Sequence, residues 1–107
     1  MITKIIDKAD ELGWKCWICS DGDLEFEKWS PAGEDIVFYV SGANPVREVQ
    51  EYARNFDADE HAEMWVGSRG KNGVPSSIRA LLDDAAAIQE MLNELAEALA
   101  EVEEDHE

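Results

Sequence analysis

Apolar residues in the C-terminal third of this sequence recur at alternating spacings of three and four positions, from Ile78 to Val102. This periodicity predicts one long helix over residues 76–104 that packs along a single stripe. We name this stripe the apolar seam; it consists of Ile78, Leu81, Ala85, Ile88, Leu92, Leu95, Leu99 and Val102. The seam can pack on the rest of the chain or on a second copy of it, and the spacing favours neither.

Three shorter helices are predicted upstream of this one. Helical spacing of apolar residues over 3–12 ends at Gly13, a residue type that commonly ends helices. A second apolar stripe predicts a helix over 45–56, and acidic residues after Asp57 indicate the start of a third helix over 59–67. The second stripe consists of Val46, Val49, Tyr52, Ala53 and Phe56.

Between the first two helices the periodicity changes to two, which is typical of β-strands. We expect strands over residues 14–20, 23–29 and 35–41, joined by turns at Asp21-Gly22 and at residues 30–33. A chain of 107 residues is long enough for one modest core but not for two. The predicted fold is therefore one α+β domain over 1–107, a three-stranded antiparallel meander packed with helices, with a long acidic C-terminal helix.

The four tryptophans are numerous for a chain of this length. Strand alternation places Trp17 and Trp29 on the face of the sheet opposite Ile18 and Phe26. Either helices cover both faces of the sheet and bury these rings, or an aromatic patch is exposed for a partner. We expect the tryptophans to lie in the core, with the exposed patch as the alternative.

The net charge of −16 is unevenly distributed along the chain. Residues 75–107 hold ten acidic residues and one basic residue, so more than half of the excess negative charge lies there. This field repels nucleic acids and anionic membranes and attracts basic surfaces. Direct binding to nucleic acid or to a membrane is therefore not expected, whereas basic nucleic-acid-binding proteins are natural targets.

On the side of this helix opposite the seam, glutamates recur at spacings of four and three. Like charges at these spacings repel by about 0.2–0.5 kcal/mol per pair, and no Lys or Arg follows Arg79. Acids near a helix C-terminus are also disfavoured by the helix dipole. A solvated surface is one explanation; the missing lysines favour a partner-binding row. The row consists of Glu90, Glu94, Glu97, Glu101 and Glu104.

No nucleotide fingerprint, Ser/His/Asp set or recognisable carboxylate pair is present, so we expect no enzyme activity and no cofactor. Cys16 and Cys19 form a C-x-x-C, which with His61 is the remaining alternative for a metal site. Residues three apart on a strand point to opposite faces, so the two sulfurs should diverge. Core packing of the cysteines is favoured, and we expect no metal.

Neither a signal peptide nor an apolar run of membrane-spanning length is found in the sequence. Two cysteines without a secretion signal are typical of a reducing compartment. We therefore expect a cytoplasmic protein.

The chain contains three further segments of note, Ser30–Asp35, Asp57–Trp65 and Gly73–Arg79, the last followed by the acidic helix. In these segments the chain resembles small acidic proteins of phages and conjugative elements in Gram-positive bacteria, a group that includes anti-CRISPR inhibitors and other anti-defence DNA mimics. The resemblance covers most of the chain and provides no catalytic motif. It implies a bacterial host cell and an inhibitory role, with a Cas9-type nuclease as the leading target.

The expected function is thus a non-enzymatic anti-defence inhibitor that presents the glutamate row to a basic protein surface as a nucleic-acid mimic. The alternative is an interaction module of a mobile element that forms a homodimer through the seam or through exposed tryptophans.

Overall fold

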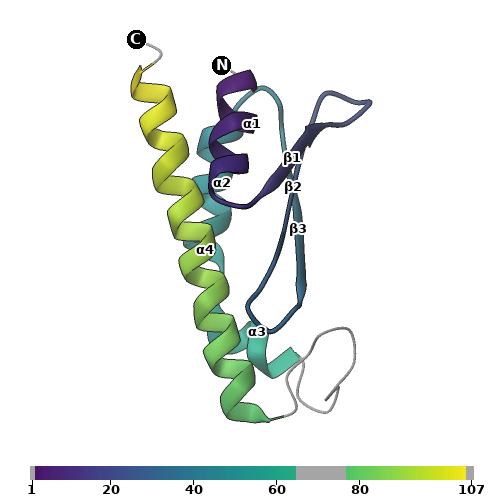
Figure 1. Cartoon of the computed structure of the whole chain (residues 1–107), viewed down its shortest axis with the longest axis vertical. Helices are drawn as coiled ribbons and strands as arrows, with labels where there is room; N and C mark the ends of the chain where they lie inside the picture. The colour runs from purple at the N-terminus through teal and green to yellow at the C-terminus, as the bar shows by residue number, and fades with distance from the viewer. Residues whose placement is uncertain (1, 65–76, 106–107) are drawn as a thin grey trace.

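The computed structural model describes residues 2–64 and 77–105, and shows an α+β fold with a three-stranded antiparallel sheet in the order β1-β2-β3 (Figure 1). No helix in these two ranges is long and apolar enough to cross a membrane. The elements in chain order are α1 (Ile2–Glu11), β1 (Lys15–Ile18), β2 (Leu24–Trp29), β3 (Asp35–Val40), α2 (Pro45–Asn55), α3 (Ala58–Met64) and α4 (Ile78–Asp105).

The first strand is three residues shorter than its predicted range of 14–20. It is shorter because both flanking residues belong to turns: the Trp14 amide donates to the Ala9 carbonyl oxygen at 2.9 Å, and the Cys19 amide donates to that of Asp23 at 2.8 Å. Apart from the end of α3, the other described elements begin and end within two residues of the predicted bounds. Residues 65–67 and 76, predicted to be helical, lie outside the described residues.

The two hairpin turns share one geometry, which sets the register of the sheet. In each three-residue loop, the amide of the last residue, a glycine, donates a hydrogen bond to the carbonyl oxygen of the residue before the loop. Gly22 donates to Cys19 at 3.0 Å, and Gly33 donates to Ser30 at 2.8 Å. Both glycines have φ near +90°, a region that L-residues with side chains rarely adopt. The resulting register pairs Phe26 with Cys16 on one side and with Phe38 on the other.

All four described helices lie on the same side of the sheet, where α1 and α2 separate the sheet from α4 (Figure 1). The inner face of the sheet contributes a stack of aromatic rings, with Phe26 and Phe38 5.2 Å apart and Trp14 edge-on to Phe38 at 5.7 Å. These rings join the buried residues of α1, α2 and α4 in one core.

The apolar seam is buried within the chain. Seven of its eight residues are at most 5% exposed, and only Ile78 at the start of α4 is exposed, at 50%. The seam packs on α1, α2 and α3. A homodimer would therefore need a surface other than the seam.

The expectation that the tryptophans lie in the core is wrong for two of them. Trp14 is 1% exposed, but Trp17 and Trp29 are 39% and 57% exposed on the outer face of the sheet. The described helices pack on the inner face alone, so they leave these rings uncovered. Trp65 lies outside the described residues.

Two buried polar contacts attach the β2–β3 turn to the helices. Asp84 of α4 is 6% exposed and accepts hydrogen bonds from the Ser30 hydroxyl at 2.7 Å and from the Ala32 amide at 3.0 Å. Nearby, His61 of α3 lies 3.0 Å from a carboxylate oxygen of Glu34, which is 8% exposed. These side chains tie the far end of the hairpin to α3 and α4.

Replacing Asp84 with Ala should lower the free energy of unfolding by about 2–4 kcal/mol, because two donors in the β2–β3 turn lose their charged acceptor. Urea unfolding followed by tryptophan fluorescence measures the change. The matched control is Asp83→Ala at the adjacent, exposed position, which should change stability by less than about 0.5 kcal/mol. Equal effects of the two substitutions would contradict this account of the turn.

Candidate partner-binding surfaces

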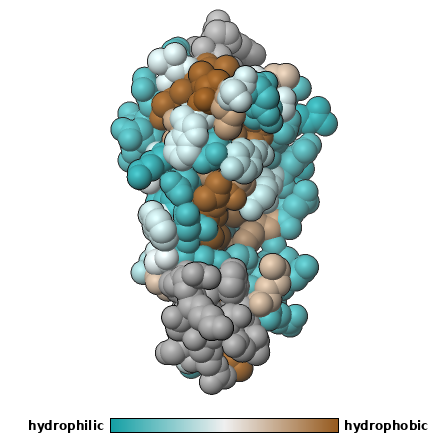
Figure 2. Space-filling model, turned by 90° about the vertical axis from the view of Figure 1, so that its right-hand side faces the viewer, coloured by the Kyte–Doolittle hydropathy of each residue, from teal (hydrophilic) through white to brown (hydrophobic). Residues whose placement is uncertain are grey.

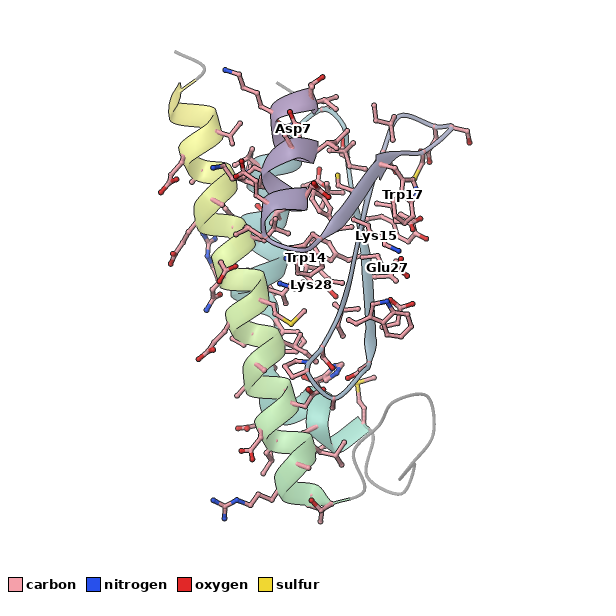
Figure 3. The ribbon with its side chains drawn as sticks, in the orientation of Figure 1. Asp7, Trp14, Lys15, Trp17, Glu27 and Lys28 are labelled. Atoms are coloured by element: carbon pink, nitrogen blue, oxygen red, sulfur yellow. The ribbon has the colours of Figure 1, made fainter. Side chains whose placement is uncertain are left out.

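The acidic side of α4 is the first candidate surface. Because the seam fixes one side of the helix in the core, the opposite side faces solvent, and Glu90, Glu94, Glu97 and Glu101 are all exposed. The side chain of the fifth predicted member, Glu104, lies outside the described residues. Figure 3 shows carboxylate oxygens along the side of α4 that faces away from the sheet.

This acidic row is long, straight and without internal compensation. From Glu90 to Glu101 it spans eleven residues of one helix, about 16 Å at 1.5 Å per residue. Among the described side chains, none forms an ion pair with these four glutamates. Several negative charges in one line can match a rigid surface that carries positive charges in a similar line.

The outer face of the sheet is the second candidate surface, and Figure 2 shows apolar and weakly polar atoms down its middle between hydrophilic margins. Figure 3 shows Trp17, Lys15 and Glu27 pointing away from the helices, whereas Trp14 and Lys28 point towards them. Strand register places the remaining members on the same face. The outer face consists of Lys15, Trp17, Glu25, Glu27, Trp29, Asp35, Val37 and Tyr39.

The carboxyl groups of the outer face are close enough to affect each other. A hydrogen bond with Asp35 is the main cause that raises the pKa of Glu27, while Lys15 opposes the rise. Similarly, a hydrogen bond to Glu25 raises the pKa of the Tyr39 hydroxyl. Lys15 is the only basic side chain on this face of the described sheet, so the face has excess negative charge beside exposed aromatic rings.

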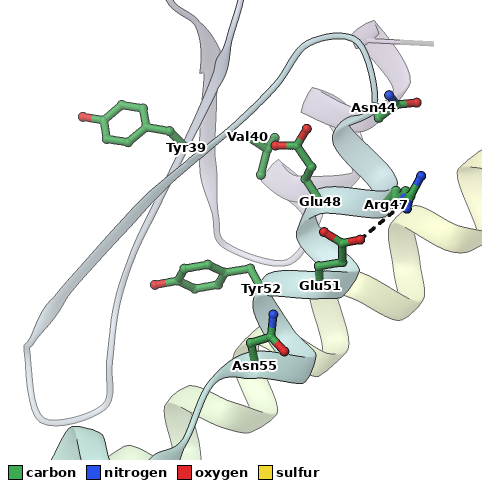
Figure 4. A pocket seen from close by; sticks show the side chains of 8 residues that line it. All are labelled: Tyr39, Val40, Asn44, Arg47, Glu48, Glu51, Tyr52 and Asn55. Carbon is green, nitrogen blue, oxygen red and sulfur yellow. Dashed lines mark hydrogen bonds and ion pairs between the residues drawn. The ribbon is translucent and has the colours of Figure 1, made fainter.

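A groove between β3 and α2 is the third candidate surface (Figure 4). It comprises a cavity of about 440 Å³ beside Tyr39 and Val40 and a second of about 280 Å³ that reaches Met64 on α3. Tyr52 and Asn55 line both cavities, so the two are adjacent. Tyr52 was predicted in a buried stripe, but at 39% exposed it forms a wall of this groove.

The possible metal ligands in the sequence are not brought together. His61 contacts Glu34, and Cys16 sits on β1, with Cys19 in the following turn. No cluster of three or more His, Cys, Asp or Glu suited to a metal is found in the described part of the chain. Burial raises the pKa of the Cys16 thiol to about 11, so this cysteine is mostly protonated at neutral pH.

The acidic residues around His61 have a helix-starting role, as predicted. An Asp57 carboxylate oxygen accepts a hydrogen bond from the Glu60 amide at 3.1 Å, and the Asp57 carbonyl accepts one from the His61 amide at 2.9 Å. These bonds satisfy backbone donors in the first turn of α3.

The chain matches no protein-family model, and comparisons with curated proteins and with solved structures give no match.

Replacing Asp35 with Asn should lower the pKa of Glu27 and raise the free energy of unfolding at pH 7. The pKa of Glu27 is raised in the folded chain. The favourable contribution of Glu27 to the free energy of unfolding is therefore present below the ordinary glutamate pKa, and it is lost as pH rises through the raised pKa. At pH 7 the two ionised carboxylates repel each other, and the neutral amide that replaces one of them removes that repulsion.

Carboxyl NMR titration and urea unfolding at pH 7 measure these two changes. Asp21→Asn is the control, since Asp21 does not contribute to the shift of Glu27. If Asp35→Asn left the Glu27 midpoint unchanged, the two carboxyl groups would not be coupled as described.

Proposed function

We propose that this chain is a non-enzymatic inhibitor that places the acidic side of α4 on the basic nucleic-acid-binding surface of a defence nuclease, with a Cas9-type nuclease as the leading target. The observation that carries the proposal is the row of four exposed glutamates on one rigid helix without an interleaved cation.

The fold itself does not require this row. The seam on the other side of α4 supplies the core contacts, and the four glutamates form no described ion pair or side-chain hydrogen bond. Their three successive pairs, at spacings of four, three and four, each repel by about 0.2–0.5 kcal/mol in an isolated helix. Because the repulsion between these glutamates destabilises the helix and no contact within the chain offsets it, a role in binding is favoured.

The spacing of the row also fits a surface that binds nucleic acid. Successive carboxylates lie about 4.5–6 Å apart along the helix axis, the same order as the roughly 3.4 Å of axial rise per phosphate on one nucleic-acid strand. Lysines and arginines arranged for phosphates would meet carboxylates at a similar pitch. Binding of this kind releases counterions and is accelerated by long-range attraction, so it weakens as salt rises.

A second candidate function is a homodimeric interaction module of a mobile element. The exposure of Trp17 and Trp29 favours it, because the outer face of the sheet is a surface that a second copy could cover. Light scattering at two concentrations tests this candidate. A molar mass that rises from that of the monomer to that of the dimer at the higher concentration supports it, and a monomer mass at both concentrations excludes it.

The first test of the inhibitor role replaces Glu90, Glu94, Glu97 and Glu101 with Gln. We expect the concentration of the chain needed for half inhibition of target-DNA cleavage by a guide-loaded Cas9-type nuclease to rise at least about tenfold, because the charges that bind the basic surface are lost. The free energy of unfolding should stay constant or rise by up to about 1 kcal/mol as repulsion is relieved.

The matched control removes four negative charges elsewhere, through Asp7→Asn, Asp10→Asn, Asp59→Asn and Glu63→Gln on α1 and α3, all exposed positions. This variant should inhibit nearly as well as the original chain. If the α4 variant inhibits fully, or if both variants lose inhibition equally, the acidic side of α4 is not the binding surface.

Salt provides an independent test of the same mechanism. Inhibition by the unmodified chain should weaken steeply between low and physiological salt, since the interaction depends on exposed charges. Cleavage assays over a salt series, normalised to the nuclease without inhibitor, measure this dependence. Inhibition that is independent of salt would move the binding site to the tryptophan-bearing face of the sheet.

A further inference from the structure

The free edge of β3 carries a row of backbone groups without partners in the sheet. The Ser30 amide donates to the Glu34 carbonyl at 2.8 Å, which makes residues 30 and 34 a hydrogen-bonded pair. Alternation then makes Ile36, Phe38 and Val40 the residues that exchange hydrogen bonds with β2. The N–H and C=O groups of Asp35, Val37 and Tyr39 consequently point away from the sheet, and no hydrogen bond between described residues involves them.

This edge lacks most of the features that usually prevent strand addition, and its one charged residue, Asp35, lies at the start of the strand. β3 has the sequence DIVFYV, with no Lys, Pro or bulge along its six residues. Val37 and Tyr39 are 37% and 60% exposed. At about 3.3 Å per residue the edge is about 20 Å long, enough for an added strand of five or six residues.

The groove beside the edge has room for the side chains of such a strand. Its lining includes Tyr52, whose ring stacks on Phe38 with centroids 4.3 Å apart. Alternate side chains of an added strand would enter the groove between β3 and α2 (Figure 4), and the others would lie over the outer face beside Tyr39.

Charge on both sides of the edge selects the occupant. Glu48 and Glu51 line the larger cavity, Asp57 and Glu60 line the smaller one, and carboxylates of the outer face flank the edge on its other side. The one Lys or Arg side chain that lines these two cavities, Arg47, already pairs with Glu51 at 3.2 Å. A second copy of this chain, with a net charge of −16, is repelled from such a surface, whereas a basic segment is attracted.

We propose that the open edge of β3 binds an extended, basic segment of a partner protein, which adds a fourth strand to the sheet and places alternate side chains in the groove against α2. This surface lies across the molecule from the acidic side of α4 (Figure 1), so the inference does not depend on the proposed inhibitor role.

The test uses a capped eight-residue peptide of alternating arginine and valine, and its fully N-methylated analogue. The analogue keeps the side chains and the charge but lacks every backbone N–H donor. At physiological salt the first peptide should bind at least about tenfold more tightly, because strand addition requires backbone hydrogen bonds. Amide hydrogen exchange measured by NMR should slow at Val37 and Tyr39 when it binds.

Substitutions in the chain separate this surface from α4. Val37→Pro removes an edge donor that β2 does not use, so it should preserve the fold, as checked by circular dichroism, and abolish peptide binding. If that variant does not fold, Val37→Lys tests the same point by placing a like charge beside the basic peptide. The variant with four Gln on α4 should retain most of the peptide binding.

Three results would overturn the proposal. Equal binding of the two peptides would indicate general charge attraction. Slowed exchange confined to α4 would place the peptide on the other surface. Slow exchange at Val37 and Tyr39 in the free chain, together with a concentration-dependent dimer, would show that a second copy occupies the edge.

Discussion

The burial of the apolar seam of α4 against α1, α2 and α3 is the constraint on which the other features depend. Ile88, Leu92, Leu95 and Leu99 are fully buried, and each contributes about 1.5–3 kcal/mol of hydrophobic stabilisation relative to exposure. α1 and α2 pack against the seam on one side and against the inner face of the sheet on the other. No described helix therefore covers the outer face of the sheet. One packing arrangement therefore produces both the free acidic side of α4 and the uncovered tryptophans.

The distribution of charge follows the same division. The exposed positions of α4 from Glu90 to Glu101 bear acids without an interleaved base, while the buried Asp84 is satisfied by Ser30 and Ala32 of the β2–β3 turn. The buried carboxylate thus contributes to the fold, and the exposed ones do not. This contrast within a single helix is the physical basis for assigning the exposed row to a partner.

Local sequence patterns were sufficient for the architecture. Spacings of three and four identified the seam, alternation identified the strands, and the glycine-containing turns indicated where the chain reverses between strands, because each of these signals acts over a few residues. Trp17 and Trp29 show where this reasoning ends: alternation placed them on the outer face, but whether a helix would cover that face depended on where α3 and α4 pack. The groove at Tyr52 and the contact between His61 and Glu34 likewise arise from distant segments, which no local pattern specifies.

If the chain acts as a nucleic-acid mimic, it competes with nucleic acid for a basic surface. Inhibition of a guide-loaded Cas9-type nuclease, measured at increasing concentrations of target DNA, tests this competition. A nucleic-acid mimic must be displaced, so the concentration of the chain needed for half inhibition should rise in proportion to DNA once the DNA exceeds its own dissociation constant. Inhibition that does not change with DNA concentration, or no inhibition at large excess of the chain, would contradict the account.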